Sequence, residues 1–268
     1  MTRAFGLIVV GDEILSGKRL DKHMPKVIEL LAARGLQLGW AEYVGDVPTR
    51  ITAALERAFA SGDIVFSTGG IGATPDDHTR QCAAKALRVP LALHPEAEGL
   101  IRERMQDTAR EQGTTYEPDR PDNVHRLNMG VFPEGASIIR NPYNKIPGFS
   151  VDHVHFVPGF PVMAWPMIES VLDSRYADLF AKGQAVEKSV IVYGAMEATL
   201  TPLMEAIEEA HPGVKVFSLP SVDHPEHGRH IELGVKGDAA VIDAAYARLL
   251  DGLRTFGARL GPELVRGD

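Results

Sequence analysis

The segment from Ala4 to Val10 is an unbroken apolar run rich in β-branched residues, and it stops at Gly11-Asp12-Glu13. Such runs are typical of strands that are buried on both faces, as in parallel sheets covered by helices. The run is too short to cross a bilayer, and it lacks the basic start and the cleavage site of a signal peptide. It therefore predicts a central strand of an α/β sheet, in a protein that we expect to be cytoplasmic.

Strands and helices alternate along the first two thirds of the chain. We predict strands at 36–44, 64–68, 137–140 and 153–157, and helices at 21–34, 49–61, 79–87, 96–112 and 162–172. This alternation builds right-handed βαβ units and hence a doubly wound, mainly parallel sheet. The polar segment 116–128 predicts an ordered surface loop.

A smaller α+β pattern starts near residues 182–184. It consists of predicted strands at 187–193, 214–219 and 230–235 and predicted helices at 200–210 and 239–256. We therefore expect two domains, 1–180 and 181–268. The tail after Gly257 is expected to be frayed.

The net charge and the cysteine content of the chain limit which ligands and which cellular compartment we expect for the protein. With 28 Lys+Arg against 36 Asp+Glu, the net charge of -8 argues against nucleic acids and anionic membrane surfaces. The single Cys82 excludes an intrachain disulfide and a cysteine-based zinc site, and it favours a reducing compartment. Any anionic ligand must be held locally, by backbone N–H groups, a few basic side chains or a metal ion.

Many of the 26 Gly and 18 Pro lie where the predicted strands of the large domain end, at 11–13, 69–72, 142–148 and 158–161. Ligands of open parallel sheets bind at this edge. Gly69, Gly70 and Gly72 precede the helix that begins at Thr79, so their backbone N–H groups form a candidate anion site. A tight turn without a ligand is the alternative interpretation.

Carboxylates follow three of these strands. Asp12 and Glu13 come after the first, Asp46 after the second, and Asp76 and Asp77 after the third. Because hard cations take oxygen ligands, the pattern favours a metal-assisted site. The alternative is that Asp46 and Asp77 cap the helices that follow them. The histidines of DHPEHGRH at 223–230 are expected to be solvated loop residues.

Several motifs in a fixed order carry a family resemblance. The chain resembles the molybdopterin-binding domain family, MoaB/Mog-like. The resemblance lies in the motifs VVGDEILSG, YVGDVPTRI, DIVFSTGGIGATPDDHT, and NPYNKIPGF followed by VPGFP. Within it, the spacing is most similar to the N-terminal region of CinA-like, competence/damage-inducible proteins, in which a small KH-like domain follows. The resemblance implies a three-layer α/β/α fold. The chain ends before the C-terminal amidohydrolase domain of such proteins, so deamidation of nicotinamide mononucleotide is not expected.

The resemblance also implies a site for a phosphorylated pterin or a related nucleotide. It implies that Asp46 and Asp77 are catalytic acids, and that Glu13, Asp46 and Asp77 hold a divalent metal such as Mg, Mn or Co. The implied ligand-binding residues are Gly11, Asp12, Glu13, Thr68, Gly69, Gly70, Gly72, Thr79, Asn141, Pro142, Pro147, Gly148, Gly159 and Pro161.

Three positions depart from the family pattern. Met163 stands where a Glu is common, His23 where Asn is usual, and Asn144 replaces a turn glycine, which Asn can do because it tolerates positive φ. The lost Glu weighs against hydrolysis more than against binding. Three hypotheses remain open. The first is a binding protein for a phosphorylated pterin or nucleotide cofactor, linked to molybdenum cofactor biosynthesis. The second is a metal-dependent pyrophosphatase that cleaves ADP-ribose- or FAD-like dinucleotides, and the third is a degenerate scaffold that acts through oligomerisation. We expect a homo-oligomer, with the acidic small domain serving packing or dimerisation and not RNA binding.

Overall fold

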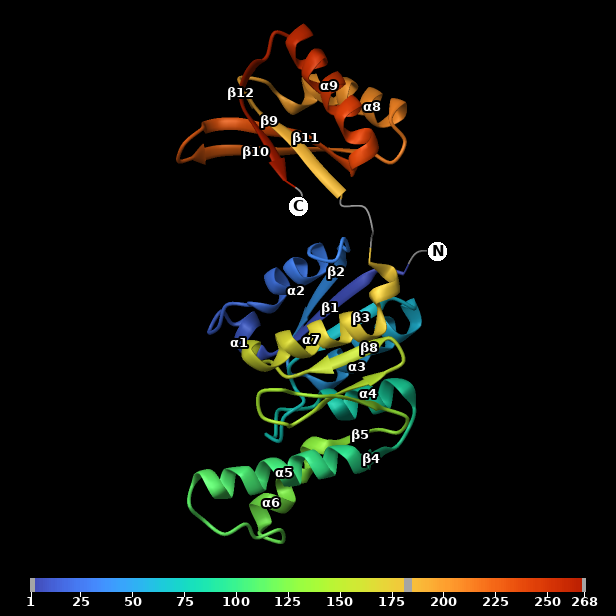
Figure 1. Cartoon of the computed structure of the whole chain (residues 1–268), viewed down its shortest axis with the longest axis vertical. Coiled ribbons are helices and arrows are strands. Elements are labelled where there is room, and N and C mark those ends of the chain that lie inside the picture. The colour runs from blue at the N-terminus through green and yellow to red at the C-terminus, as the bar shows by residue number, and fades with distance from the viewer. Residues whose placement is uncertain (1–2, 181–184, 267–268) are drawn as a thin grey trace. The chain divides into compact units, whose positions relative to one another are not determined.

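The computed structural model describes residues 3–180 and 185–266 (Figure 1). Contacts between residues divide the chain into two compact units, of which the first ends at Phe180 and the second follows it. The first unit contains two large clusters of buried apolar side chains, and the second contains one. Each unit therefore has a hydrophobic core of its own.

The first unit is built on a six-stranded sheet with the order β2-β1-β3-β8-β7-β6. The first four strands in this order are parallel, β7 is antiparallel to β8, and β6 is antiparallel to β7. The prediction of a mainly parallel sheet is confirmed. The strands are β1 (Phe5–Val10), β2 (Leu38–Val44), β3 (Ile64–Thr68), β6 (Ser137–Ile139), β7 (Gly148–Val151) and β8 (Val154–Val157).

Helices cover both faces of this sheet (Figure 1). All six residues of β1 are buried, with Leu7 and Val9 packed against α2 and α7, and Ile8 and Val10 packed against α3 and α4. Successive side chains of a strand point to opposite faces, so an entirely apolar strand needs a helical layer on each side. The fold is thus three-layer α/β/α. The helices are α1 (Asp12–Leu15), α2 (His23–Ala32), α3 (Pro48–Ser61), α4 (Thr79–Leu87), α7 (Pro161–Arg175) and the 3-10 helix η2 (Ala177–Leu179).

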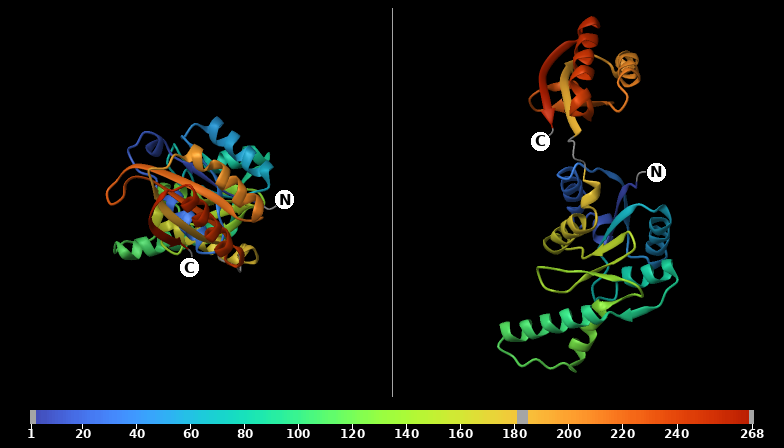
Figure 2. Two further views of the ribbon diagram at one scale, coloured as in Figure 1. Left: turned by 90° about the horizontal axis from the view of Figure 1, so that it is seen from above. Right: turned by 45° about the vertical axis from the view of Figure 1, so that its right-hand side comes forward.

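A lobe projects from the sheet between α4 and β6 (Figures 1 and 2). Phe132 in the lobe stacks on Phe149 of β7 with ring centroids 4.6 Å apart, and Phe149 stacks on Phe156 of β8 at 4.4 Å. The prediction of a loop at 116–128 was partly wrong, because Pro121, with its fixed φ, begins a short helix there. The lobe consists of β4 (Leu91–Leu93), α5 (Pro95–Glu111), α6 (Pro121–Arg126), the 3-10 helix η1 (Leu127–Gly130) and β5 (Val131–Pro133).

The second unit is a four-stranded antiparallel sheet, in the order β10-β11-β9-β12, with two helices against it (Figure 2). Val190 and Val192 of β9 and Leu233 of β11 pack against Leu249 and Leu253 of α9. None of the described helices, here or in the first unit, is long and apolar enough to cross a membrane. The elements are β9 (Ala185–Tyr193), α8 (Glu197–Ala210), β10 (Lys215–His224), β11 (Gly228–Asp238), α9 (Ala239–Thr255) and β12 (Arg259–Arg266).

The prediction of a frayed tail after Gly257 was wrong, because β12 pairs with β9. Gly261 and Pro262 interrupt the strand pattern in the sequence, and the pairing accommodates them in an irregularity between Leu260 and Glu263. Pro is tolerated at the edge of a sheet, where its missing N–H group costs no ladder hydrogen bond. The guanidinium of Arg259 also lies 4.4 Å from the ring centroid of Tyr193.

Candidate ligand-binding site

The loops that follow β1, β2, β3 and β8 meet at one edge of the first sheet. The N–H group of Gly11 donates to the carbonyl of Val44, and that of Gly69 donates to the carbonyl of Val157. A Cβ on Gly69 would lie 2.3 Å from the Val10 carbonyl oxygen, and one on Gly159 would lie 3.4 Å from the Gly69 Cα. The sequence-predicted residues of these loops are therefore brought together.

The carboxylates of Asp12 and Asp46 join the ends of β1 and β2. The N–H group of Asp12 donates to Asp46 Oδ2 at 2.9 Å, and the N–H group of Asp46 donates to Asp12 Oδ1 at 3.1 Å. A Cβ on Gly45 would lie 2.3 Å from Asp12 Oδ1, so this turn requires glycine. Burial raises the pKa of Asp46, the hydrogen bond from Asp12 opposes the rise, and the charges of Asp12, Glu13 and Asp76 add to it.

Asp77 closes the glycine-rich loop instead of capping a helix. Its Oδ2 accepts hydrogen bonds from the backbone N–H group of Thr74 at 2.8 Å and from the Thr74 hydroxyl at 2.6 Å. Helix α4 begins after His78 and α3 after Val47, and neither helix has a side-chain cap. The capping alternative for Asp46 and Asp77 was therefore wrong.

The three predicted metal ligands, Glu13, Asp46 and Asp77, do not form a metal site by themselves. Among the described residues, no group of three or more His, Cys, Asp or Glu side chains is arranged to hold a metal ion. Magnesium is commonly bound by one or two carboxylates together with substrate phosphates and water. The side chains present thus do not fit a cage made by the protein alone.

The turn from β3 into α4 depends on two glycines with positive φ. Gly69 has a φ of 94° and Gly70 a φ of 68°. A Cβ on Gly70 would lie 2.2 Å from the Thr79 hydroxyl oxygen. That hydroxyl donates to the Gly69 carbonyl at 3.0 Å, and the Thr79 N–H group donates to the Gly70 carbonyl at 2.9 Å. Thr79 thereby fixes the loop against the start of α4.

Two residues that the sequence analysis missed hold carbonyl groups of the same loop. Arg80 is 4% exposed, and its Nη2 donates to the Gly72 carbonyl at 2.6 Å. His125 of α6 donates from Nε2 to the Ala73 carbonyl at 3.0 Å. A signal for Arg80 was available, since it shares the apolar face of α4 with Ala83 and Ala84. His125 could not be found, because it comes from the lobe.

The Arg80 guanidinium is a buried charge without an ion-pair partner. Within the described part of the chain its Nη2 bonds to a carbonyl and not to a carboxylate, and its Nε has no hydrogen-bond partner. Burial lowers the pKa of Arg80, and the charge of Asp77 opposes this change. A buried cation in this situation is costly unless an anion compensates it.

A pocket of about 290 Å³ opens beside these loops, between the ends of β1 and β3 and the start of α7. Four predicted site residues line it: Glu13, Thr68, Gly159 and Pro161. His23 and Phe160 line it as well and were not assigned to the site from sequence. Side chains on both sides of the strand ends thus face a common hollow.

Four of the predicted ligand-binding residues do not line this pocket: Asn141, Pro142, Pro147 and Gly148. Asn141 and Pro142 line a second hollow of about 470 Å³, together with Lys145. Pro147 is buried, and Gly148 lies in β7, where a Cβ would come within 2.2 Å of the Phe156 carbonyl oxygen. These residues shape the sheet edge and the second hollow.

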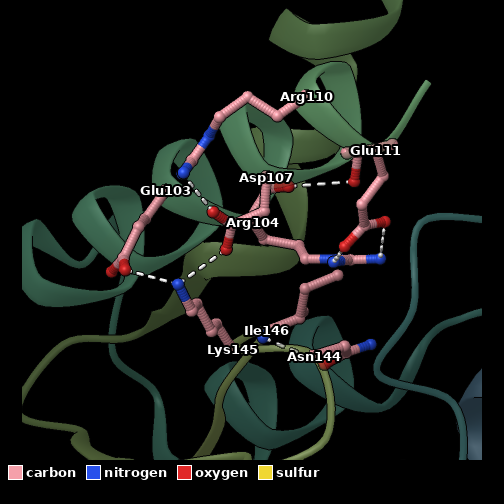
Figure 3. Close-up of polar contacts among 9 residues, drawn as sticks. Glu103, Arg104, Asp107, Arg110, Glu111, Asn144, Lys145 and Ile146 are labelled. Carbon is pink, nitrogen blue, oxygen red and sulfur yellow. Dashed lines mark hydrogen bonds and ion pairs between the residues drawn. The ribbon is translucent and has the colours of Figure 1, made fainter. Parts of the chain in front are cut away.

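Lys145, not Asn144, takes the positive φ in this segment, with a value of 65°. Asn144 Oδ1 instead accepts hydrogen bonds from the Ile146 N–H group at 3.0 Å and from Asn141 Nδ2 at 2.8 Å. The expectation for Asn144 was therefore wrong, because its side chain forms the turn by hydrogen bonding. Lys145 binds Asp107 at 2.6 Å and also Glu103, which ties the segment to α5 (Figure 3).

The histidines of the second unit form a cluster and are not all solvated. The rings of His224, His227 and His230 lie 5.0 to 5.6 Å apart, and His230 is buried. His224 Nδ1 accepts hydrogen bonds from backbone N–H groups of its own hairpin, and His230 Nδ1 bonds to the Gly228 carbonyl. The expectation of solvated loop residues was wrong for His230.

Comparison with known proteins matches residues 6–178 to the family described as "Probable molybdopterin binding domain". A CinA-like protein of Desulfosudis oleivorans is 29% identical over 78% of this chain and 50% of its own length, and one of Geobacter metallireducens is 29% identical over 98% and 61%. A protein of Aeropyrum pernix is 30% identical over 97% of this chain and 94% of its own length. The chain thus spans about half the length of the first of these relatives.

The fold is also similar to a solved structure, that of the protein CinA from Thermoplasma acidophilum, whose function is given as unknown. The two chains are 25% identical with a TM-score of 0.54, and the similarity covers 64% of this chain and 98% of the other.

Proposed function

Because the chain belongs to the molybdopterin-binding domain family, we propose that its first unit binds a phosphorylated pterin or a related nucleotide at the loops that end β1 and β3. The observation that carries the proposal is the buried guanidinium of Arg80, which lies against the glycine-rich loop without a carboxylate partner. A phosphate bound at that loop would supply the missing negative charge.

The loop itself favours an anion. Helix α4 begins without a side-chain cap, so the positive end of its dipole faces the loop, while the Thr79 N–H group is already bound to the Gly70 carbonyl. The carbonyl groups of Gly72 and Ala73 are held by Arg80 and His125, which keeps these oxygen atoms occupied. In a chain with a net charge of -8, these local features would bind phosphate although the protein as a whole is acidic.

The experiment that tests this proposal is calorimetric titration with ADP-ribose and with 6-hydroxymethylpterin diphosphate. Arg80→Met keeps the length and the apolar stem of the side chain and removes its charge. We expect it to weaken binding roughly tenfold or more, since hydrogen bonds and contacts to charged groups contribute about 1.5–3 kcal/mol. Lys85→Met, on the exposed face of the same helix, is the matched control for the loss of one positive charge.

The stability of the free protein gives a second readout for the same variant. Removal of a buried charge that has no ion-pair partner and only the field of Asp77 to offset its burial should leave the free energy of unfolding unchanged or higher, even though the hydrogen bond to Gly72 is lost. A ligand affinity equal to that of the wild type, together with a large loss of stability, would assign Arg80 a structural role only and contradict the proposal.

A second candidate function is hydrolysis of a pyrophosphate bond in an ADP-ribose- or FAD-like dinucleotide. The observation that favours it is Asp46, whose pKa is raised by burial and by the carboxylates around it. A carboxylate with a raised pKa is a better general base and could hold the proton of an attacking water. Incubation with ADP-ribose or FAD and Mg²⁺, Mn²⁺ or Co²⁺ tests this function; AMP release that matches the level of Asp46→Asn and Asp77→Ala variants would exclude it.

A further inference from the structure

Three cations lie close together in the loop that joins α1 to α2, residues 16–22. They are Lys18, Arg19 and Lys22, and all three residues are exposed. None of them takes part in an ion pair within the described ranges, 3–180 and 185–266. In a chain with a net charge of -8, this loop is therefore a local region of uncompensated positive charge.

The one carboxylate of this loop is bound by other groups. Asp21 Oδ1 accepts a hydrogen bond from the His23 N–H group at 2.8 Å. Asp21 Oδ2 accepts from the Met24 N–H group at 3.1 Å and from the Tyr43 hydroxyl at 2.7 Å. Burial, the hydrogen bond to Asp21 and the charge of Asp21 raise the pKa of Tyr43 to about 12. The negative charge of Asp21 is thus engaged by the start of α2 and by β2.

Hydrogen bonds fix the backbone of the loop at both of its ends. At its start, the Gly17 N–H group donates to the Ile14 carbonyl at 3.1 Å, and the Arg19 N–H group donates to the Glu13 carbonyl at 3.0 Å. At its end, Asp21 holds the first N–H groups of α2. A ligand that binds the cations would therefore order side chains and not a whole loop, which lowers the entropic cost of binding.

Two of the three cations line the pocket of about 290 Å³. Arg19 and Lys22 do so together with Glu13, whereas Lys18 does not. The Glu13 carboxylate lies against the end of β1, since a Cβ on Gly11 would be 2.6 Å from Glu13 Oε2. The exposed side of the pocket is thus a cationic rim made by Arg19 and Lys22.

This rim lies beside the loop to which we assign the phosphate. Thr68 lines the same pocket and is followed directly by Gly69, the first residue of the glycine-rich loop. A ligand held at the glycine-rich loop therefore has the pocket next to it and the cationic rim at the exposed side of the pocket. Arginine suits this position, because its planar guanidinium can bind two oxygen atoms of one phosphate group.

We propose that Arg19 and Lys22 bind a second phosphate group of the ligand whose first phosphate lies at the glycine-rich loop. The inference rests on the proposed function and adds a specificity to it. Ligands with two separated phosphate-bearing positions bind more tightly than ligands with one. Lys18, which lies outside the pocket, contributes only to the local positive field.

An anionic lipid surface is the competing partner of these cations, because Leu20, which lies between them, is 84% exposed. Segments that bind such surfaces through charge commonly carry about 4–8 Lys or Arg residues, more than this loop has. A bilayer would also approach the acidic remainder of the chain, whereas a small ligand meets only the pocket and its rim. The observations therefore favour the phosphate group of a small ligand.

Calorimetric titration with ADP-ribose and with ADP-ribose 2′-phosphate tests the proposal, because the second ligand carries an additional phosphate away from the diphosphate. We expect the wild type to bind ADP-ribose 2′-phosphate about tenfold more tightly, which corresponds to about 1.4 kcal/mol. The double variant Arg19→Met/Lys22→Met should bind the two ligands with equal affinity. Both residues are exposed, so the substitutions should not affect folding.

Lys18→Met is the matched control for the loss of a cation from this loop. It removes an exposed positive charge that does not line the pocket, so the preference for ADP-ribose 2′-phosphate should persist. The charge-conserving variant Arg19→Lys should retain part of the preference, since it keeps the charge and loses the two-oxygen geometry. Salt should reduce the preference of the wild type between about 0.1 M and about 1 M, because exposed charges are screened.

The outcomes separate this inference from the proposed function. Equal affinity of the wild type for the two ligands, or a preference that survives in Arg19→Met/Lys22→Met, overturns the inference, and the phosphate site at Arg80 then stands if Arg80→Met weakens binding of both ligands. A preference lost as fully in Lys18→Met would assign the effect to the general field of the loop and also overturn it. A wild type that binds neither ligand would contradict the proposed function, and the inference with it.

Sedimentation with phosphatidylserine vesicles addresses the lipid alternative. We expect the wild type to remain in solution. Sedimentation of the wild type that is lost in Arg19→Met/Lys22→Met would assign the loop to a membrane surface and overturn the inference.

Discussion

Asp12 and Asp46 each accept a hydrogen bond from the other residue's backbone N–H group, at 2.9 and 3.1 Å. The two loops that they join follow neighbouring parallel strands, so this exchange fixes the edge of the sheet on which the candidate site is built. It does so with two carboxylates side by side, and the charge of Asp12 contributes to the raised pKa of Asp46.

Asp46→Asn should stabilise the free protein at neutral pH. The folded pKa of Asp46 lies above its usual value of 3.8, so the folded state binds this proton more tightly than the unfolded state, and stability falls as pH rises through the folded pKa. The amide keeps an acceptor for the Asp12 N–H group and removes the charge. Urea unfolding at pH 7 and pH 3.5 should show the gain only at pH 7, with the exposed Asp178→Asn as control. A loss of stability at both pH values would mean that the carboxylate of Asp46 stabilises this edge of the sheet.

His155 should make the first unit lose stability in mild acid. It is fully buried between the Ser150 hydroxyl at 2.8 Å and the Tyr176 hydroxyl at 2.6 Å, and burial lowers its pKa from 6.5 to about 3. Below pH 6.5 the unfolded chain binds a proton that the folded protein rejects, so stability falls by about 1.4 kcal/mol per pH unit down to pH 3.

The variant His155→Gln isolates this contribution from the titration of other groups. Between pH 7 and pH 5, the slope of its free energy of unfolding against pH should correspond to the uptake of about one proton less on unfolding than in the wild type. Tryptophan fluorescence is a suitable probe, since Trp40 and Trp165 both lie in the first unit. Identical slopes for the two proteins would show that the pKa of His155 is not lowered in the folded state.

The variant Lys145→Gly should be more stable than the variant Lys145→Ala. Its φ of 65° is disfavoured for any residue with a Cβ, and glycine adopts it freely. Lys145→Gly and Lys145→Ala both lose the ion pairs with Asp107 and Glu103, so the difference between them, about 1 kcal/mol in favour of glycine, measures the backbone alone. Lys85, in the last turn of α4, should show the opposite order. The same order at both positions would rule out a strained backbone at Lys145.

Arg266 should stabilise the second unit through Glu232. Its guanidinium makes two hydrogen bonds to this carboxylate, at 2.5 and 3.1 Å, and the bonds lower the pKa of Glu232. Arg266→Met should destabilise the unit by about 1–3 kcal/mol at pH 7, because it leaves a half-buried carboxylate with only the Ser189 hydroxyl.

Adding Glu232→Gln to Arg266→Met should restore part of that loss, since the uncompensated charge is then absent. Glu232 stabilises the folded state above its usual pKa of 4.5, and this contribution is lost as pH falls, so the wild type and the double variant should converge in acid. Hydrogen exchange at the amides of β9 and β12 measures the effect, because both tryptophans lie in the first unit. If hydrogen exchange of β12 is unchanged in Arg266→Met, the pairing of β12 with β9 depends on backbone hydrogen bonds alone.

Long elements with a strong apolar pattern could be predicted from the sequence. The strand at 64–68 and the helix at 79–87 match β3 and α4 residue for residue, since an apolar run bounded by Asp63 and Gly69 and a single apolar helix face leave few alternatives. The strands β4, β5 and β7 were not predicted, whereas β6 and β8, which are equally short, were. Strands of three or four residues carry little local pattern and depend on their partners in the sheet. β12 was missed because Gly261 and Pro262 are local signals against a strand, and pairing with β9 outweighs them.

For the candidate site, the sequence predicted only those contacts that follow from the order of the strands in the fold. Parallel strands place their carboxyl ends at one edge, so the proximity of Asp12 and Asp46 follows from the fold class. The contact of His125 with Ala73 spans 52 residues and depends on how the lobe folds back, which no local pattern encodes. The role of Arg80 depends on burial, which a charged residue type normally argues against.

The aromatic column of Phe132, Phe149 and Phe156 runs from the lobe through two strands of the sheet. Because the rings are stacked face to face and buried, the lobe cannot swing as a hinged arm without breaking the column. The lobe and the antiparallel edge of the sheet therefore belong to one cooperative folding unit, and they should open to solvent exchange together. His125 of the lobe is hydrogen-bonded to Ala73, so the glycine-rich loop is held by both the sheet and the lobe. The loop is therefore preorganised, and a ligand would bind it without a change of its conformation.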